Sequence, residues 1–345
     1  MKPPSEKQAN QLATLVADLY VVDAYYLQQN QIVLSLRNRY DRVKSVKLLK
    51  DRLKLAGYRF TLSQSENALL LSVDPKKHIA IPRLNIILFL ATLGTVFFVP
   101  RMIFGWDGYI FTTALMSILL FHEMGHFVAS RRRGIITSWP YFIPAPNIIG
   151  TFGALIKSKS PFRNRRDLIE VGASGPIVGW FVALGWLIYG LSKSTVLTGD
   201  PTAVVGMPFS LDGESILIKT LVPILIGSAP ADSFYLFSEA AFAGWVGLLV
   251  TALNMLPIGQ LDGGHVVYGL AHKKQVTLGW LACGGLFIFG FQSMMWWVWG
   301  AMALIMKVPH PPTLDDRIAP STFAKIMGWT ALLILVLSFT PVPFQ

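Results

Sequence analysis

The sequence predicts a polytopic α-helical membrane protein of about six to eight transmembrane helices, preceded by a small soluble α+β domain. Two observations support this fold class. The chain has 345 residues, of which 53% are hydrophobic and only 14% charged, so it is too apolar for an ordinary soluble domain of its size. Residues 1–80 are polar and patterned, whereas apolar stretches with short polar links follow from residue 81. We therefore expect two domains, 1–80 and 81–345.

Three patterned stretches define the N-terminal domain. Residues Gln31–Arg37 alternate between apolar and polar side chains, as a strand does, and Asp41–Leu55 has apolar positions at helical spacing. Arg59–Val73 alternates again and predicts a strand pair. The first thirty residues lack the pattern of a cleaved signal peptide, so we expect them in the mature protein. We expect this domain on the cytoplasmic side of the membrane.

The second domain contains seven candidate spans, several of them shorter than the usual ~20 residues. They lie near 84–100, 107–130, 168–190, 239–258, 276–290, 292–306 and 322–340. Ser215–Gly227 is apolar but only half a span long, so it is expected at the interface or as a re-entrant segment. Ile135–Ile156 holds several prolines and cannot form a regular helix. Such backbone at membrane depth must be surrounded by protein or by a water-filled cavity.

Basic residues predict the orientation. Fourteen Lys and Arg side chains precede residue 84, and Arg131, Arg132 and Arg133 follow the second span. Two spans separate these groups, so both fall on one side, which should be the cytoplasmic side or its equivalent. Segment 192–239 has five acidic residues against two lysines and belongs on the opposite side. The net charge of +11 thus reflects topology and lipid contact, and we expect no nucleic-acid binding.

The motif His122-Glu123-Met-Gly-His126 lies inside the second apolar stretch. On a helix, His122 and His126 are one turn apart and face the same way, so both imidazoles can reach one tetrahedral ion. Glu123 stands beside them to take a proton from a water ligand. Because Arg131 follows His126 after about 7.5 Å of helix, the metal would sit in the bilayer nearer the cytoplasmic face. The alternative is a pair of core histidines with a surface glutamate.

Two histidines leave such a site one protein ligand short when one position is kept for water. Asp262 is the best candidate, because the preceding apolar run ends on the same side of the membrane as the His122–His126 helix. Pro257 would end that run, and Gly263 and Gly264 would let the backbone turn inward. An ordinary Asp-Gly turn at the surface is the alternative. Three rival ligands stay open: His265, His310 and Glu239.

Together these residues resemble the paired signature of the site-2 protease family of intramembrane zinc metalloproteases. The signature consists of His122-Glu123-Met-Gly-His126 and Asn254-x-x-Pro257-x-x-x-x-Asp262-Gly263. Three further phrases resemble the plastid-type branch, which lacks a PDZ domain: Gly172-Ala-Ser-Gly-Pro176, the run from Ala243 to Asn254, and His310-Pro-Pro-Thr-Leu-Asp-Asp316. There is one departure from many relatives, which insert a PDZ domain between spans: segment Ser192–Glu239 has under fifty residues and no convincing β-rich domain. Any substrate selection that a PDZ domain performs elsewhere must be absent or done by the N-terminal domain and the irregular loops.

The resemblance implies a peptidase with one Zn²⁺ ion, bound by His122, His126 and Asp262. Glu123 would be the catalytic base, and Asn254 would contact the substrate or the developing oxyanion. The implied substrate is a single-span membrane protein cleaved within or near its transmembrane helix. We expect an integral protein of the bilayer, in a bacterial inner membrane first and a plastid membrane second.

Two other functions stay open from the sequence. Gly172-Ala-Ser174-Gly175 contains the G-x-S-G pattern of a serine protease, although small residues in a span more often allow close helix packing. A metal-binding membrane transporter without protease activity is the stronger alternative, because intramembrane histidines and acids also mark ion pathways. Glu123 discriminates a metalloprotease from a transporter, since peptide hydrolysis needs a base at this position and ion transport does not.

Overall fold

The computed structural model describes residues 4–28, 31–39, 42–64, 68–77, 81–159, 161–200, 204, 206–230 and 232–343. The chain divides into two compact units. Unit 1 consists of residues 1–83 with the segments 130–139 and 156–162, and unit 2 consists of residues 84–129, 140–155 and 163–345. Each unit has its own large hydrophobic core.

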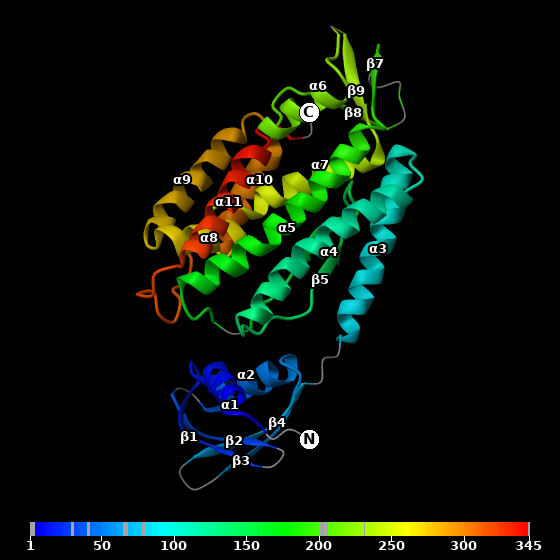
Figure 1. Ribbon diagram of the computed structural model, residues 1–345. Helices are drawn as coiled ribbons and strands as arrows, with labels where there is room; N and C mark the ends of the chain where they lie inside the picture. Colours follow the sequence, from blue (N-terminus) through cyan, green and yellow to red (C-terminus); the bar gives the residue numbers. More distant parts are fainter. Residues whose placement is uncertain are drawn as a thin grey trace. The chain divides into compact units, whose positions relative to one another are not determined.

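Unit 1 is a layer of two helices packed on a four-stranded antiparallel sheet (Figure 1). Its elements are α1 (Glu6–Val16), β1 (Tyr20–Leu27), β2 (Ile32–Asn38), α2 (Arg42–Leu55), β3 (Tyr58–Gln64) and β4 (Leu69–Lys77), with sheet order β1-β2-β4-β3. Alternate residues of β2, Ile32, Leu34 and Leu36, are buried in the core that both helices share. The period-two pattern therefore selects the face that the helices cover.

The structure confirms the secondary structure predicted for the N-terminal region. The strand expected at Gln31–Arg37 is β2, and the strand pair expected at Arg59–Val73 is β3 with β4. The turn between them, residues 65–67, lies outside the described residues, as does Asp41 at the start of the predicted helix. The sequence reading missed α1 and β1 in the first thirty residues.

Unit 2 is a helical bundle with two small antiparallel sheets. Its helices are α3 (Arg83–Phe104), α4 (Tyr109–Arg132), α5 (Arg165–Leu191), α6 (Ile216–Leu225), α7 (Glu239–Asn254), α8 (Asp262–Ala271), α9 (Lys274–Phe289), α10 (Met294–Met306) and α11 (Thr322–Ser338). Each of the seven predicted spans corresponds to a helix. Among the described residues, α3, α4 and α5 are long and apolar enough to cross a membrane. The predicted half-span forms the short helix α6.

Two segments, Ile135–Ile156 and the connection between α5 and α7, contain short strands. Within Ile135–Ile156, β5 (Tyr141–Pro144) pairs with β6 (Thr151–Leu155), which confirms that this segment is not a regular helix. Between α5 and α7, β7 (Thr195–Thr198), β8 (Met207–Phe209) and β9 (Ser233–Phe237) form a sheet of order β7-β9-β8. The expectation of no β-rich domain here therefore needs one qualification, because a small three-stranded sheet is present.

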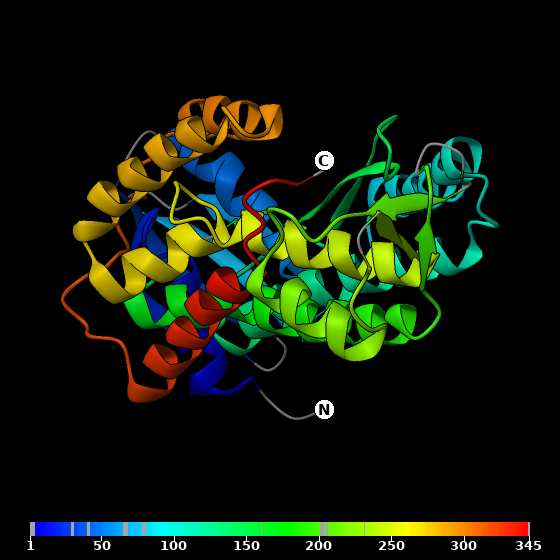
Figure 2. The ribbon, with the colours of Figure 1, turned by 90° about the horizontal axis from the view of Figure 1, so that it is seen from above.

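Helix α5 lies at the centre of unit 2, in contact with α7, α8 and α11 (Figures 1 and 2). Small residues allow the close approach of α5 to α7. A Cβ atom on Gly244 would lie 2.5 Å from the backbone nitrogen of Leu187, so only glycine fits at this crossing. Helices α9 and α10 pack against each other as a pair. This arrangement places α5 between the two parts of the chain that carry the candidate metal ligands.

Candidate metal centre

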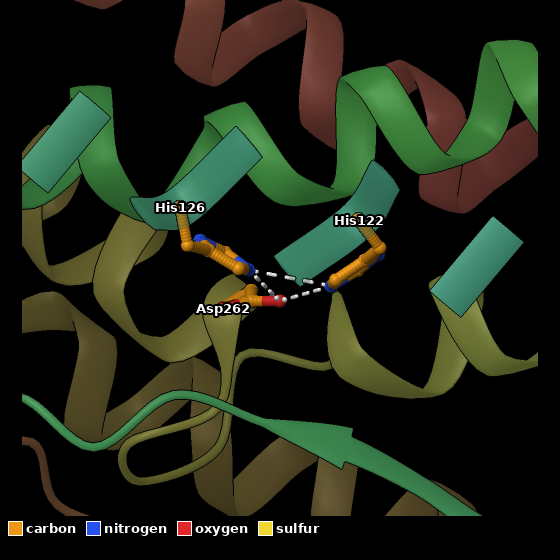
Figure 3. Close-up of side chains that lie close together, drawn as sticks. All are labelled: His122, His126 and Asp262. Atoms are coloured by element: carbon orange, nitrogen blue, oxygen red, sulfur yellow. Dashed lines mark hydrogen bonds and ion pairs between the residues drawn. The ribbon is translucent and has the colours of Figure 1, made fainter. Parts of the chain in front are cut away.

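Three predicted ligands, from two helices that are far apart in the sequence, lie close together (Figure 3). The His122 and His126 side chains extend from α4, and Asp262 extends toward them from the first residue of α8. The Asp262 Oδ2 atom lies 3.3 Å from His122 Nε2 and 3.2 Å from His126 Nε2. The two Nε2 atoms are 3.3 Å apart. A tertiary contact across 136 residues of sequence thus completes a set of three donor atoms.

This donor set fits a tetrahedral metal ion. An ion with ligands at about 2.0–2.1 Å places the ligand atoms about 3.3–3.4 Å apart, which is the spacing seen here. Two imidazoles and one carboxylate are ligands that zinc accepts, and a fourth position is left for water or substrate. We found no other group of three potential ligand side chains within the described ranges.

The His126 imidazole is held in the orientation that a metal requires. The Nδ1 atom of His126 lies 2.8 Å from the Val171 carbonyl oxygen of α5. Because a carbonyl only accepts, Nδ1 carries the proton and Nε2 presents its lone pair toward His122 and Asp262. His122 and His126 are only 4% and 8% exposed. The contact with α5 thus fixes the orientation of the buried His126 ring.

Glycines of α5 make room for these imidazoles. A Cβ atom on Gly175 would overlap the His126 ring, and one on Gly179 would lie 2.8 Å from His122 Nδ1. In return, Gly125 of α4 lets the Ser174 carbonyl approach, since a Cβ there would lie 2.6 Å from that oxygen. The Ser174 hydroxyl donates to Val171 within its own helix. The small-residue phrase around Ser174 therefore serves helix packing, which disfavours the serine-protease alternative.

Asp262 is placed by a tight turn and by close backbone packing. Helix α7 ends at Asn254, and Gly259 in the following turn has a φ of 51°. Gly263 and Gly264 do not form the inward turn predicted from the sequence. They lie in the first turn of α8, where a Cβ atom on either would overlap backbone of residues 255–259. The aspartate is thus the first residue of a helix, and the simple Asp-Gly turn is excluded.

Glu123 lies beside the two histidines and is 4% exposed. Its Oε2 atom is buried and makes no hydrogen bond within the described part of the chain. A buried carboxylate oxygen without a partner is energetically costly and often marks a functional group. This oxygen is consequently available to a water molecule or to a substrate amide at the metal position.

The remaining candidates lie elsewhere. Glu239 accepts hydrogen bonds from the backbone amides of Asp107 and Phe111, so it caps the start of α4, far along the helix from His122. His265 and His310 contact each other, with 2.6 Å between Nδ1 and Nε2, and neither belongs to the three-ligand group. Asn254 is half-buried at the end of α7. Its role stays a prediction.

A helical unit with long apolar spans and a buried two-histidine, one-aspartate site beside a glutamate defines a membrane-embedded protein with a candidate metal centre. The model of peptidase family M50 matches residues 110–289, about half of the chain. The chain therefore belongs to this family, the site-2 proteases, which are embedded in membranes.

Several curated proteins are similar to the chain. The probable chloroplastic zinc metalloprotease EGY1 of Arabidopsis thaliana is 34% identical over 66% of this chain and 42% of its own length. The probable chloroplastic zinc metalloprotease EGY2 of Oryza sativa subsp. indica is 29% identical over 70% of this chain and 43% of its own length. The chain thus matches less than half of either relative. No solved structure matches the chain.

Proposed function

We propose that this chain is an intramembrane zinc metalloprotease that hydrolyses a peptide bond within or near a transmembrane helix of a membrane-protein substrate. One observation carries the proposal. Two histidines of a helix long enough to span a membrane meet a remote aspartate at tetrahedral spacing, with a buried, unpaired glutamate oxygen beside them. Membership of peptidase family M50 supports the same activity.

Each side chain has a distinct task in this reaction. His122, His126 and Asp262 would hold the zinc ion, which supplies Lewis acidity to water and to the scissile carbonyl. Glu123 takes the proton of the attacking water through its unpaired oxygen and delivers it to the leaving amine. The α5 backbone keeps His126 in the required tautomer throughout. Asn254, at the end of α7, is assigned to the substrate carbonyl or the oxyanion.

The substrate must present an unwound strand, because a helix hides its amides in hydrogen bonds. We assign this task to the β5–β6 hairpin, which has only two strands and could gain a third by β-addition. Phe142 of β5 belongs to the large core that also holds Leu119 of α4, and its ring contacts Phe89 of α3 at 5.1 Å between centroids, so the hairpin is part of unit 2 and packs against α3. Its Phe152 side chain is 73% exposed.

Crosslinking tests this assignment. The buried Cys283 is first replaced by Ser, and cysteines are then introduced at Phe152 or, as the control, at the exposed Tyr109 at the other end of α4. A single-span substrate with a cysteine beside its scissile bond should form a disulfide with residue 152 and not with residue 109. Equal crosslinking at both positions, or none at residue 152, would exclude the hairpin as the docking strand.

The proposed topology counts six to eight spans. The three long helices and the shorter α7, α9, α10 and α11 together give seven, with α6 at the interface. The basic residues after His126 support a metal site nearer the cytoplasmic face or its equivalent, with residues 1–80 on that side. Because the relatives named above are chloroplastic, we favour a plastid membrane over the bacterial inner membrane that the sequence suggested first.

Replacing the base tests the proposed function directly. Glu123→Gln should keep bound zinc and lower cleavage of a single-span substrate in liposomes by at least about 100-fold, because the amide cannot take the proton. Ser174→Ala is the matched control and should keep most activity. A transporter would instead move zinc across the vesicle with Gln at position 123. Unchanged cleavage by the Glu123→Gln form would refute the mechanism.

A further inference from the structure

The phrase His310-Pro-Pro-Thr-Leu-Asp-Asp316, singled out in the sequence, has no task in this mechanism, although its side chains reach the helix that carries Asp262. Residues 307–317, which we call the strap, connect α10 to α11 without a regular helix or strand. The strap includes His310, Thr313 and Asp316. All of its residues are described, and they belong to unit 2 together with the metal centre.

The first anchor joins His310 to His265, in the first turn of α8. The His310 Nδ1 atom lies 2.5 Å from the Pro311 carbonyl oxygen, so this nitrogen carries a proton. In a neutral ring, Nε2 is then an acceptor, and the His265 Nδ1–H group, 2.6 Å away, donates to it. A directional pair of hydrogen bonds thus runs from α8 into the strap, three residues after Asp262.

The second anchor joins Asp316 to the rest of α8. The Tyr268 hydroxyl donates to Asp316 Oδ2 at 2.7 Å, and His272 Nε2 lies 3.4 Å from the same oxygen. Thr313 donates to the other carboxylate oxygen at 2.7 Å. The aspartate therefore holds the last turn of α8 and its C-cap residue, and at the same time fixes the conformation of the strap.

The strap also holds the turn that precedes Asp262. The backbone amide of Gly259 donates to the Val308 carbonyl at 2.8 Å. The fully buried Gln275 of α9 accepts from the His310 amide and donates to the carbonyls of Val308 and Pro257. Asp262, the first residue of α8, consequently follows a turn, residues 257–259, that is hydrogen-bonded to the strap and Gln275, and it begins a helix that is hydrogen-bonded to the same strap.

At its far end the strap reaches α5, which orients His126. The Asp315 amide donates to the Arg163 carbonyl at 2.9 Å, and Arg165 Nε donates to the Asp316 carbonyl at 3.0 Å. Through α5 the strap is connected to His126, since the Val171 carbonyl accepts from that imidazole. The strap is thus a physical link between the two halves of the metal centre.

We propose that His310 and Asp316 are positioning residues of the metal centre, which hold α8 so that Asp262 stays at ligand distance from His122 and His126. Neither belongs to the three-ligand group. The inference rests on the proposed zinc site but not on the peptidase reaction, so metal binding can test it separately.

The test uses the full-length chain in detergent, with zinc affinity measured by chelator competition and site geometry by the visible absorption of Co²⁺. His310→Ala and Asp316→Asn should each weaken zinc binding by about 10- to 100-fold, as loss of groups that orient ligands usually does. Both should also change the Co²⁺ spectrum at saturation. His310→Gln should recover part of the affinity, because its amide oxygen can accept from His265.

Asp315→Asn is the matched control. Its carboxylate contacts only Arg317 among the described residues and does not reach α8, so zinc affinity and the Co²⁺ spectrum should not change. If His310→Ala fails to fold, Tyr268→Phe tests the second anchor by removing one hydroxyl, and it should shift the spectrum in the same direction.

Three results would overturn the proposal or its basis, and they are distinguishable. Wild-type zinc affinity and spectra in His310→Ala and Tyr268→Phe would refute the positioning role. An equal loss in Asp315→Asn would show a general effect of the strap on stability. Wild-type protein that binds zinc but cleaves no membrane substrate would refute the proposed function, while the zinc titrations of the variants would still decide the positioning role.

Discussion

The packing of α5 against the histidines makes a sharp prediction for Gly175→Ala. A Cβ atom at this position would overlap the His126 imidazole, and Nε2, the candidate ligand atom, is the nearest atom. The ring must move by about 1 Å to restore van der Waals contact. Its Nδ1 atom donates a hydrogen bond to the Val171 carbonyl oxygen. The ring therefore cannot move without losing that hydrogen bond or its orientation toward Asp262.

We expect Gly175→Ala to lower the affinity for zinc more than it lowers the free energy of unfolding. Overpacking costs about 1–3 kcal/mol, and Gly→Ala in a helix returns about 0.5–1 kcal/mol, so the free energy of unfolding should fall by at most about 2.5 kcal/mol. A displacement of about 1 Å at a reacting centre can cost about 100-fold. We therefore expect zinc affinity and proteolysis to fall by about that factor in a protein that still folds.

Two other glycines of α5 provide the internal controls. A Cβ atom on Gly179 would lie 2.8 Å from His122 Nδ1, a milder overlap, whereas one on Gly185 would meet nothing within 4 Å. Zinc affinity should therefore fall in the order Gly185→Ala, Gly179→Ala, Gly175→Ala, with the first equal to wild type. Chelator competition and thermal unfolding in detergent measure both quantities. Wild-type zinc affinity in Gly175→Ala would refute the reasoning.

Two further predictions concern groups away from the metal. Burial raises the pKa of Glu214, in the loop before α6, to about 7, despite hydrogen bonds from Trp245 and Thr340. A raised folded-state pKa stabilises below the unfolded value of 4.5, and this contribution, about 3 kcal/mol, is lost as the pH rises through 7. Thermal midpoints from pH 5 to 8.5 should fall in wild type and stay level in Glu214→Gln; parallel curves would contradict this. In unit 1, Arg52→Ala should lower the free energy of unfolding by about 3–5 kcal/mol. The reason is that the 3%-exposed guanidinium donates to both Asp18 carboxylate oxygens and to two backbone carbonyls. Urea unfolding measures this loss, and a curve unchanged from wild type would contradict the role.

Local sequence patterns were sufficient for much of the fold. Apolar runs predicted every long helix of unit 2, and alternation predicted β2, β3 and β4. Helix α1 was also readable, because Ser5 and Gln8 form a capping box and its buried residues recur at helical spacing. The sheet β7-β9-β8 could not be predicted from the sequence, since each strand is only three to five residues long and pairs across up to forty intervening positions.

The candidate site was predictable in part for a different reason. One helical turn separates His122 from His126, so their convergence follows from local geometry. Asp262 competed with Glu239, His265 and His310, and no local pattern distinguishes a ligand from a capping or supporting residue. Only tertiary contacts separate them, since Glu239 caps α4 whereas Asp262 reaches the imidazoles.

These contacts give α5 a role that a list of ligands would miss. On one face its glycines leave space for the imidazoles of α4, and elsewhere Gly190 packs against the start of α7. Gly172 lies against His265 of α8, where an added Cβ would come within 2.8 Å of the His265 side chain. One helix thus sets the positions of both ligand-bearing helices. In a membrane, where helix association depends on close packing rather than on the hydrophobic effect, small residues are what make such a closely packed site possible. A bulky substitution on α5 should therefore impair metal binding before it impairs folding.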